Sequence, residues 1–308
     1  MISDAAPLVS IIVPVFNRAD SLPAAIASIA AQTFSDWEII VVDDCSSDRS
    51  GQVALDAGLR GKLRVVRHEI NRGPSAARNT GILEARGRFV SFLDSDDRWL
   101  PEKLRRQVEL AASDPDQNSL FCVTQTLVIM GEGRIRIRPE RPPAPGEAWS
   151  EFLYVADGFA QTNSFFVSRN LAMRIPFRTI VRQHEDNLFF LEAGAIGARY
   201  RLIEEPLSIW NHDFRTDRMG LTPHLEQSRE FLTQAGGLLT ERARMAFEVR
   251  YLGPLLFQEN PANAIKLFVR AVISGAVRPS HLLGVAARYA LSARTVDSLR
   301  RLHYKAPA

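Results

Sequence analysis

Three carboxylates stand within four positions at the end of an apolar run. In FVSFLDSDDRW, five residues suited to a protein interior, 89–93, lead directly into Asp94, Asp96 and Asp97. Carboxylates this close repel one another, and such a cluster costs stability unless a metal ion or an arginine lies against it. Mg²⁺ and Mn²⁺ prefer carboxylate oxygens and often share their coordination shell with phosphates. The motif therefore predicts an oxygen site for a divalent cation holding a diphosphate, the alternative being a solvated acidic turn before a helix near residues 101–110.

The elements before this motif predict where the acids lie. Short β-rich runs alternate with helix-period segments, which indicates βαβ units and a mostly parallel α/β sheet. The predicted strands are residues 9–16, 37–44, 63–68 and 88–94, with an Ala-rich helix before the last. Because the ligand crevice of such sheets lies at the carboxyl ends of the strands, Asn17, Asp44 and Asp94 are expected to converge there. Residues 162–169 predict another strand, and Glu185 and Asp186 lie in the first turn of a predicted helix.

Composition limits the class of protein. The 308 residues allow one or two domains, and 46% apolar with 24% charged residues is ordinary for a soluble globular chain. The N-terminus lacks the basic region of a signal peptide, and the apolar tracts are too short to span a bilayer. Two cysteines, Cys45 and Cys122, fit a reducing cytosol, and no zinc-ligand spacing is present. These features predict a cytoplasmic protein.

The C-terminal part has its own charge. Residues 242–308 hold 11 Lys+Arg against 3 Asp+Glu, which leaves 27 against 32 for residues 1–241. Helical periodicity continues through this tail, where one predicted helix has an apolar stripe with Lys266 and Arg270 beside it. We expect a domain of residues 1–215 followed by a helical region of residues 216–308. The basic tail predicts either peripheral contact with an anionic membrane surface or an ordinary helical cap facing water.

Five motifs in order resemble those of the inverting GT-A glycosyltransferases of family 2, which use nucleotide-diphosphate sugars. They are VSIIVPVFN, QTFSDWEIIVVDDCSSD, NRGPSAARNTGI, FVSFLDSDDRWLP and HEDNLFF. The resemblance covers roughly residues 8–215. It implies a GT-A fold, meaning a Rossmann-like sheet with flanking helices, and an enzyme that needs Mn²⁺ or Mg²⁺.

The resemblance also implies roles for residues at the strand ends. Phe16 matches the aromatic that stacks on the nucleotide base, and Asp44 matches the acid that accepts the uracil N–H. Pro14 and Asn17 would shape that pocket, and Arg78 would contact the base or the diphosphate, for which a guanidinium is suited. The structural alternatives are Phe16 as core filler, Asp44 as a cap for the helix after SSD, and Arg78 as an exposed helical charge.

The metal and the chemistry are assigned to the remaining motifs. Asp96 is similar to the direct metal ligand, with Asp94 nearer the ribose and Asp97 in support at the metal. His212 is a candidate for the metal or the leaving diphosphate, although a lone His is as often structural. Asp186 resembles the catalytic base that takes the proton from the acceptor hydroxyl. Its alternative is an acid placed only for the helix dipole.

Other functions fit the chain less well. A dinucleotide-binding oxidoreductase needs G-x-G-x-x-G after the first strand, where this chain has VPVFNRAD, and no Gly-rich loop of a nucleotidyltransferase is present. A catalytically silent transferase-like module that acts as an assembly partner is the alternative, against which Asp96 and Asp186 together argue. The expected partners are a nucleotide-sugar donor, most simply a UDP-sugar, and a glycan or lipid-linked acceptor, with no nucleic acid.

Overall fold

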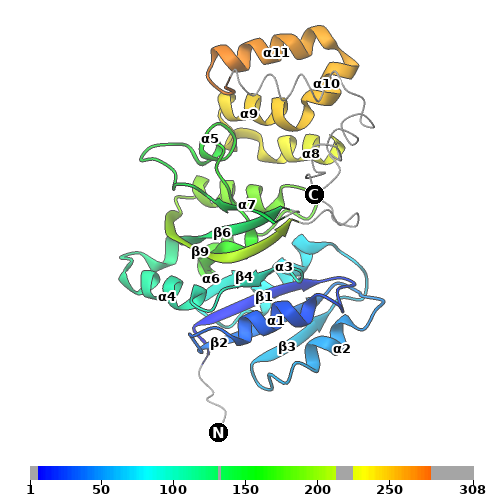
Figure 1. The fold of residues 1–308 in the computed structure, drawn as a ribbon, viewed down its shortest axis with the longest axis vertical. Coiled ribbons are helices and arrows are strands. Elements are labelled where there is room, and N and C mark those ends of the chain that lie inside the picture. Colours follow the sequence, from blue (N-terminus) through cyan, green and yellow to red (C-terminus); the bar gives the residue numbers. More distant parts are fainter. Residues whose placement is uncertain (1–5, 131–132, 213–224, 279–308) are drawn as a thin grey trace, which may run out of the picture. The chain divides into compact units, whose positions relative to one another are not determined.

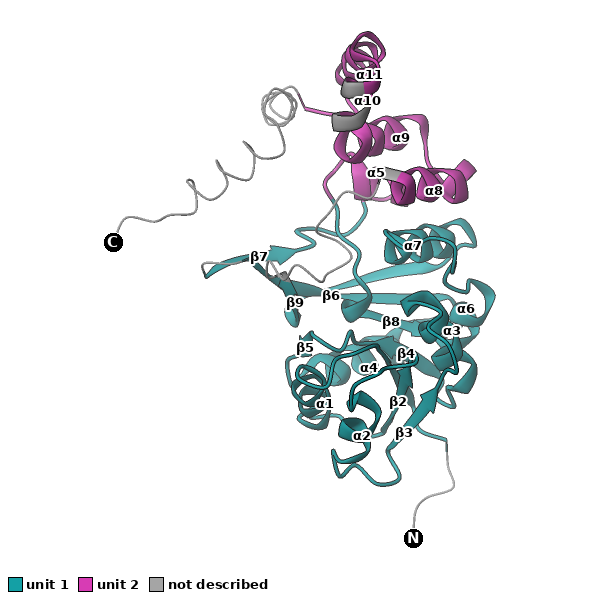
Figure 2. Cartoon of the chain, turned by 90° about the vertical axis from the view of Figure 1, so that its right-hand side faces the viewer, with its two compact units in different colours: residues 1–143, 158–214 teal, residues 144–157, 215–308 magenta. Residues whose placement is uncertain are grey.

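The computed structural model describes residues 6–130, 133–212 and 225–278 (Figure 1). The chain forms two compact units, one of residues 1–143 and 158–214, the other of residues 144–157 and 215–308 (Figure 2). The second unit thus takes in residues 144–157, which the sequence had placed in the domain predicted over residues 1–215. The predicted assignment of catalysis to residues 1–215 and of a separate helical region to residues 216–308 stays a prediction.

One mixed sheet organises the first unit, in the order β3-β2-β1-β4-β8-β6-β9-β5, with β7 paired to β6. The first four strands in this order are parallel, whereas β8 joins β4 and β6 in antiparallel fashion. The α/β class and the mostly parallel N-terminal half are therefore as predicted. The strands are β1 (Val9–Val15), β2 (Trp37–Asp43), β3 (Leu63–Arg67), β4 (Phe89–Phe92), β5 (Arg98–Trp99), β6 (Leu120–Met130), β7 (Arg134–Arg138), β8 (Phe165–Ser168) and β9 (Arg199–His212).

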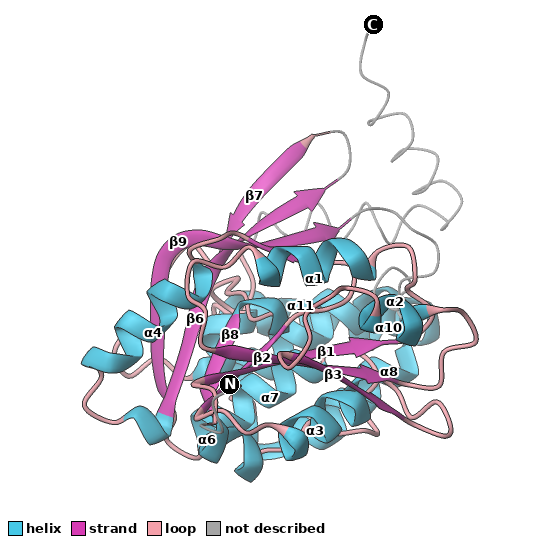
Figure 3. Cartoon of the chain, turned by 90° about the horizontal axis from the view of Figure 1, so that it is seen from below, coloured by secondary structure: helices cyan, strands magenta, loops and turns pink. Residues whose placement is uncertain are grey.

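Helices cover both faces of this sheet, with α1 and α3 on opposite sides of the parallel strands (Figure 3). A short 3₁₀ turn, η2 (Thr162–Ser164), leads into β8. The helices of the first unit are α1 (Leu22–Ala30), α2 (Ser50–Leu55), α3 (Pro74–Glu84), α4 (Lys103–Ser113), α6 (Arg169–Arg174) and α7 (Glu185–Ala195). Those of the second are α5 (Trp149–Tyr154), α8 (Leu225–Ala235), α9 (Glu241–Phe247), α10 (Gly253–Glu259) and α11 (Pro261–Ile273).

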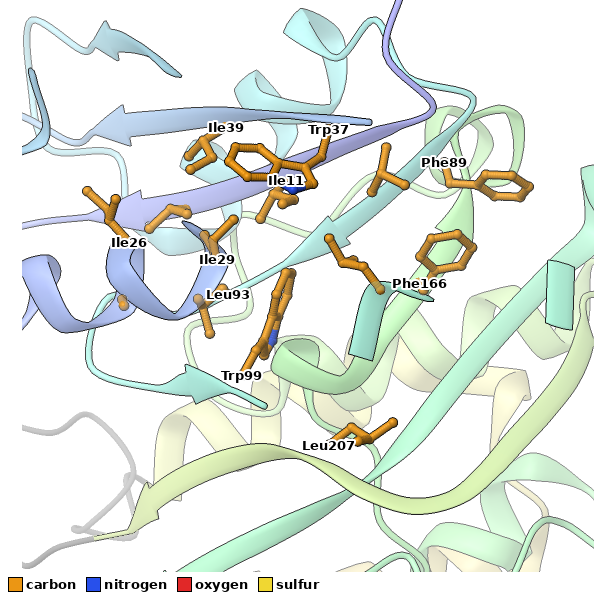
Figure 4. Packing of buried hydrophobic residues seen from close by; sticks show 14 of the residues in the cluster. Ile11, Ile26, Ile29, Trp37, Ile39, Phe89, Leu93, Trp99, Phe166 and Leu207 are labelled. Carbon is orange, nitrogen blue, oxygen red and sulfur yellow. The ribbon is translucent and has the colours of Figure 1, made fainter. Parts of the chain in front are cut away.

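The core forms because alternate strand residues meet one helical stripe. Ile11 and Ile39, from adjacent strands, are fully buried in one cluster with Ile26 and Ile29 of α1 (Figure 4). Trp99 of β5 belongs to the same cluster. Side chains at i and i+3 on α1 share a face, so the helix presents an apolar side to the sheet. On the other side of the sheet an aromatic layer holds α7, in which the Phe177 and Phe189 rings stack 4.2 Å apart.

The second unit has a separate aromatic core. The Tyr154 ring of α5 packs edge-on against Phe247 of α9, with centroids 5.2 Å apart, and Phe231 of α8 stacks on Phe247 at 4.7 Å. These contacts explain why residues 144–157 group with the C-terminal helices. Within the ranges that the structure describes, none of the helices has the length and apolar character needed to cross a membrane.

Helix α3 approaches the sheet closely because one of its residues has no side chain. A Cβ on Gly81 would lie 2.3 Å from Cγ2 of Ile12, far inside van der Waals contact. Ile12 is fully buried in β1, so it has little room to move. The glycine therefore sets the distance between α3 and β1.

Gly81→Ala should lower the free energy of unfolding by about 1–3 kcal/mol, because the added methyl group overpacks a filled site. Urea denaturation followed by circular dichroism measures this. Gly237→Ala is the matched control, since a Cβ at Gly237 meets nothing within 4 Å. Equal stability of the two variants would contradict the close approach.

Candidate active site

The loops after β1 and β2 are tied together by one amide. Asn17, in the left-handed region with φ 52°, accepts hydrogen bonds through Oδ1 from the backbone N–H groups of Ser47, at 2.8 Å, and Asp48. Its own N–H donates to Ser46 Oγ. Phe16 beside it is 45% exposed, so it is not core filler, and its ring is available for stacking. Pro14 is buried in β1, where it pairs with Val42 of β2.

Asp44 is buried where β2 ends and α3 begins. Its carboxylate accepts the backbone N–H groups of Arg72 and Gly73, the latter at 2.7 Å, and contacts His68 Nδ1 at 2.7 Å. The acid therefore sits at the N-terminus of α3, where the helix dipole favours a negative charge. It does not cap the helix after SSD, which was the structural alternative. The Arg72 N–H is shared between both oxygens, so the carboxylate has four hydrogen-bond contacts in all.

Arg78 carries the charge of α3 into the centre of the site. Its side chain is only 4% exposed, and its guanidinium donates to Asp94 at 2.8 Å and to Glu185 at 3.1 Å. These two carboxylates raise its pKa against the opposing effect of burial. The exposed helical charge considered above is thus wrong. A positive partner was expected for the acids after β4, and Arg78 is that partner for Asp94.

The acid loop, residues 93–97 between β4 and β5, presents its three carboxylates differently. Asp94 and Asp96 are half-buried, whereas Asp97 is 1% exposed. Asp97 Oδ2 accepts the side-chain amides of Asn163, at 2.9 Å, and Gln161, and its Oδ1 accepts the backbone N–H of Asn211. Burial, together with the charges of Asp94 and Asp96, raises the pKa of Asp97 well above its usual range. Because Asp97 is almost inaccessible and already accepts three hydrogen bonds, its position favours a supporting role over direct metal binding.

Asp186 lies in the first turn of α7, next to Glu185. Its Oδ1 accepts the N–H of Asn187 at 2.7 Å. Burial raises the pKa of Asp186 to about 7, with the charges of Glu185 and Asp94 adding to the rise and Arg78 opposing it. A carboxyl group with this pKa changes protonation state near neutral pH, which is what a general base requires. An acid placed only for the helix dipole would not need this environment.

A divalent cation suits the donor set at the mouth of the acid loop. Asp94 and Asp96 offer half-buried carboxylate oxygens, the ligands that Mg²⁺ and Mn²⁺ prefer. No preformed cluster of three or more His, Cys, Asp or Glu occurs among residues whose placement is described, so water and a ligand phosphate would complete the shell. His212 ends β9, paired with Met130, and its side chain lies outside the described residues.

Several residues of the site were not predicted. Glu185 was treated only as a neighbour of Asp186, yet it binds Arg78, and His68 was given no role although it contacts Asp44. The role of Glu185 could have been inferred from the sequence. Glu185 and Asp186 are adjacent acids, and an arginine was expected to lie against clustered acids. The amides of Gln161, Asn163 and Asn211 carry no local signal, because they reach the acid loop across more than 60 residues of sequence.

The sequence is similar to those of known glycosyltransferases. Residues 10–184 match the description "Glycosyl transferase family 2". The amylovoran biosynthesis glycosyltransferase AmsB of Erwinia amylovora is 28% identical over 65% of this chain and 68% of its own length. The succinoglycan biosynthesis protein ExoO of Rhizobium meliloti is 44% identical over 64% of this chain but only 58% of its own length.

Two solved structures share the fold. Residues 1–349 of S. aureus TarS, in complex with UDP, superpose with a TM-score of 0.62 at 20% identity, covering 91% of this chain and 87% of that one. The mannosyltransferase PcManGT from Pyrobaculum calidifontis, in complex with GDP-Man and Mn²⁺, superposes with a TM-score of 0.58 at 18% identity. The match covers 96% of this chain and 83% of that one. At these identities the likeness shows the GT-A fold alone. With the family match covering more than half of its residues, the chain belongs to glycosyl transferase family 2.

Proposed function

We propose that this chain is a metal-dependent, inverting glycosyltransferase that moves a sugar from a UDP-sugar to a hydroxyl of a glycan or lipid-linked acceptor. The observation that carries the proposal is the arrangement around Arg78, which pairs with Asp94 of the acid loop and with Glu185, the neighbour of Asp186 in the first turn of α7. The relatives named for amylovoran and succinoglycan biosynthesis support a product of the bacterial polysaccharide class. A cytoplasmic site of synthesis fits this role.

In the proposed mechanism, Asp186 accepts the proton of the acceptor hydroxyl while its oxygen attacks the anomeric carbon. The bond from that carbon to the diphosphate oxygen breaks, its electron pair stays with the nucleoside diphosphate, and the configuration of the sugar inverts. Phe16 stacks on the base and Asp44 accepts its N–H. Asp94, fixed by Arg78, orients the ribose end of the donor. The arrangement places binding groups and the base on separate elements.

A bound Mn²⁺ or Mg²⁺ would neutralise charge on the leaving diphosphate. Asp96 would hold it, with Asp97 fixing the loop from inside and His212 as a further candidate ligand. Arg78 is already engaged by two carboxylates, so it acts on the donor through Asp94 more than by direct phosphate contact.

The second unit is proposed to contact an anionic membrane. On α11, Ile265, Val269 and Ile273 recur every four residues and are 53%, 51% and 81% exposed. Lys266 is exposed beside this stripe, and Arg270 pairs with Glu241 at 2.8 Å. An apolar stripe flanked by basic residues is typical of helices that lie in a membrane interface. An ordinary helical cap facing water does not explain three exposed apolar side chains in line.

Asp186→Asn should lower sugar transfer by roughly 10²- to 10⁴-fold, because the amide cannot take the proton. UDP affinity in Mn²⁺ should stay within about threefold of wild type, since the nucleotide contacts lie elsewhere. The wild-type rate should rise as pH increases through about 7, where Asp186 loses its proton, and the variant should not show this rise.

Glu192→Gln, on the same helix and paired with Arg178 at 2.7 Å, is the control and should retain activity. Glu185→Gln is unsuitable because Glu185 holds Arg78. Unchanged transfer by Asp186→Asn would mean that the base is another residue.

Asp96→Ala should abolish transfer and remove the part of UDP binding that depends on Mn²⁺. The test is the melting temperature with UDP, measured with Mn²⁺ and with EDTA, because a ligand that binds only the folded state raises it. Asp56→Ala, at an exposed acid that follows the end of α2, should behave like wild type. Full transfer in EDTA would refute the metal dependence, and Mn²⁺-dependent UDP binding without hydrolysis of any nucleotide sugar would favour the silent module.

Ile265→Ser/Ile273→Ser should weaken binding of the full chain to vesicles containing phosphatidylglycerol, measured by co-sedimentation. Lost apolar burial is the reason, and raised salt should weaken the wild-type binding too. Phosphatidylcholine vesicles and Ala262→Ser, an exposed position at the start of α11, serve as controls. Equal binding by the double variant and wild type would remove the membrane proposal.

A further inference from the structure

Lys103, the first residue of α4, is entirely buried although it carries an amine. Its side chain is 0% exposed, and within the described part of the chain it forms no ion pair with a carboxylate. Its Nζ donates to Gln107 Oε1 at 2.9 Å and to Ser91 Oγ at 3.2 Å, and it lies 4.0 Å from the centroid of the Trp99 ring. Three neutral partners thus match the three N–H groups of an ammonium.

These partners lie on both sides of the acid loop. Ser91 belongs to β4, the strand that enters the loop, and Trp99 to β5, the strand that leaves it. One amine therefore touches both strands. Figure 4 shows Trp99 in the packed layer beneath this region, near Leu93, the first residue of the loop.

The same partners also hold the backbone that supports Asp97. Ser91 Oγ donates to the Phe165 carbonyl at 2.5 Å, Gln107 Nε2 to the Ser164 carbonyl at 3.0 Å, and Trp99 Nε1 to the Asn163 carbonyl at 2.7 Å. Three consecutive carbonyls are thereby fixed by side chains gathered around Lys103. From this segment the Asn163 amide reaches Asp97 Oδ2 at 2.9 Å.

A buried amine without an anionic partner costs folding free energy. Burial accordingly lowers the pKa of Lys103 to about 7, while the Cys122 thiol has an opposing effect. A methionine would fill the same space without this cost. The presence of an amine at this position is explained if its directional hydrogen bonds hold the neighbouring strands in one geometry that apolar packing alone would not specify.

We propose that Lys103 is a positioning residue that fixes the separation of β4 and β5 and, through the segment of residues 163–165, the orientation of Asp97 in the acid loop. The expected effect of Lys103 on donor binding rests on the proposed function, whereas its effect on the acid loop does not. Lys103 itself touches neither donor nor acceptor in this account. It acts by holding the loop that carries Asp94 and Asp96 in one geometry.

The direct test is amide hydrogen exchange of the full chain without nucleotide or metal. Lys103→Met keeps the length of the side chain and removes the donors. Exchange of the amides of residues 93–99 should accelerate at least about tenfold, as expected where a local opening becomes easier, with little change in β1–β3. Trp99→Phe keeps the ring but loses the bond to the Asn163 carbonyl. It should show a smaller effect in the same segment and replaces Lys103→Met if that variant does not fold.

Ser10→Ala is the matched control for a general loss of stability. Ser10 is also fully buried in a polar network on β1, but its hydrogen bonds go to Glu38, at 2.7 Å, and to the backbone of residues 86 and 87, and not to the partners of Lys103. This variant should leave exchange of the acid loop unchanged relative to the rest of unit 1. A uniform acceleration in Lys103→Met, or none in residues 93–99, would overturn the inference.

The second readout is UDP affinity by calorimetry. Lys103→Met should weaken UDP binding in Mn²⁺ by roughly tenfold, as loss of a supporting group commonly does at metal sites, and leave UDP binding in EDTA unchanged. Equal loss in both conditions would overturn the inference. If Mn²⁺ has no effect on the wild type, the metal part of the proposed function fails, and loop exchange alone then decides the role of Lys103.

Discussion

A guanidinium buried between two carboxylates is the interaction on which the candidate site depends. Arg78 links α3, the acid loop and the start of α7 through Asp94 and Glu185. A buried charge is tolerated only where partners satisfy it, so the three elements must come together at one distance. Gly81, one turn further along α3, lets the helix lie close enough to the sheet for this to happen.

The site nevertheless carries an excess of negative charge. Asp94 and Glu185 pair with Arg78, and burial together with the charges of neighbouring acids raises the pKa values of Asp97 and Asp186. Such an excess is costly in an empty protein and favourable beside a divalent cation. Under the proposed function, this arrangement would favour a metal–diphosphate complex over a free diphosphate.

Much of the N-terminal half followed from the sequence because its information is local. Strand runs ending in Asp44 and Asp94 fixed which edge of the sheet carries the acids, and the first turn of α7 was predicted with Asp186 in place. The rest of the sheet was not, since β6 pairs in parallel with β9 over a separation of some 80 residues and the pattern of residues 107–148 is weak. Lys103 was not singled out, because burial of an amine depends on Trp99, Ser91 and Gln107 together and leaves no mark in the local periodicity.

The order of the strands has a consequence for how the protein is made. The four parallel strands and α3 come from residues 9–92, so a nascent chain has the Asn17 and Asp44 loops early, together with Arg78. The groups that hold Asp97 come from residues 161, 163 and 211, and Glu185 from α7. Contacts of such long sequence separation form late. During synthesis the edge with the Asn17 and Asp44 loops therefore precedes the acid loop, which takes its final geometry only when β9 joins the sheet.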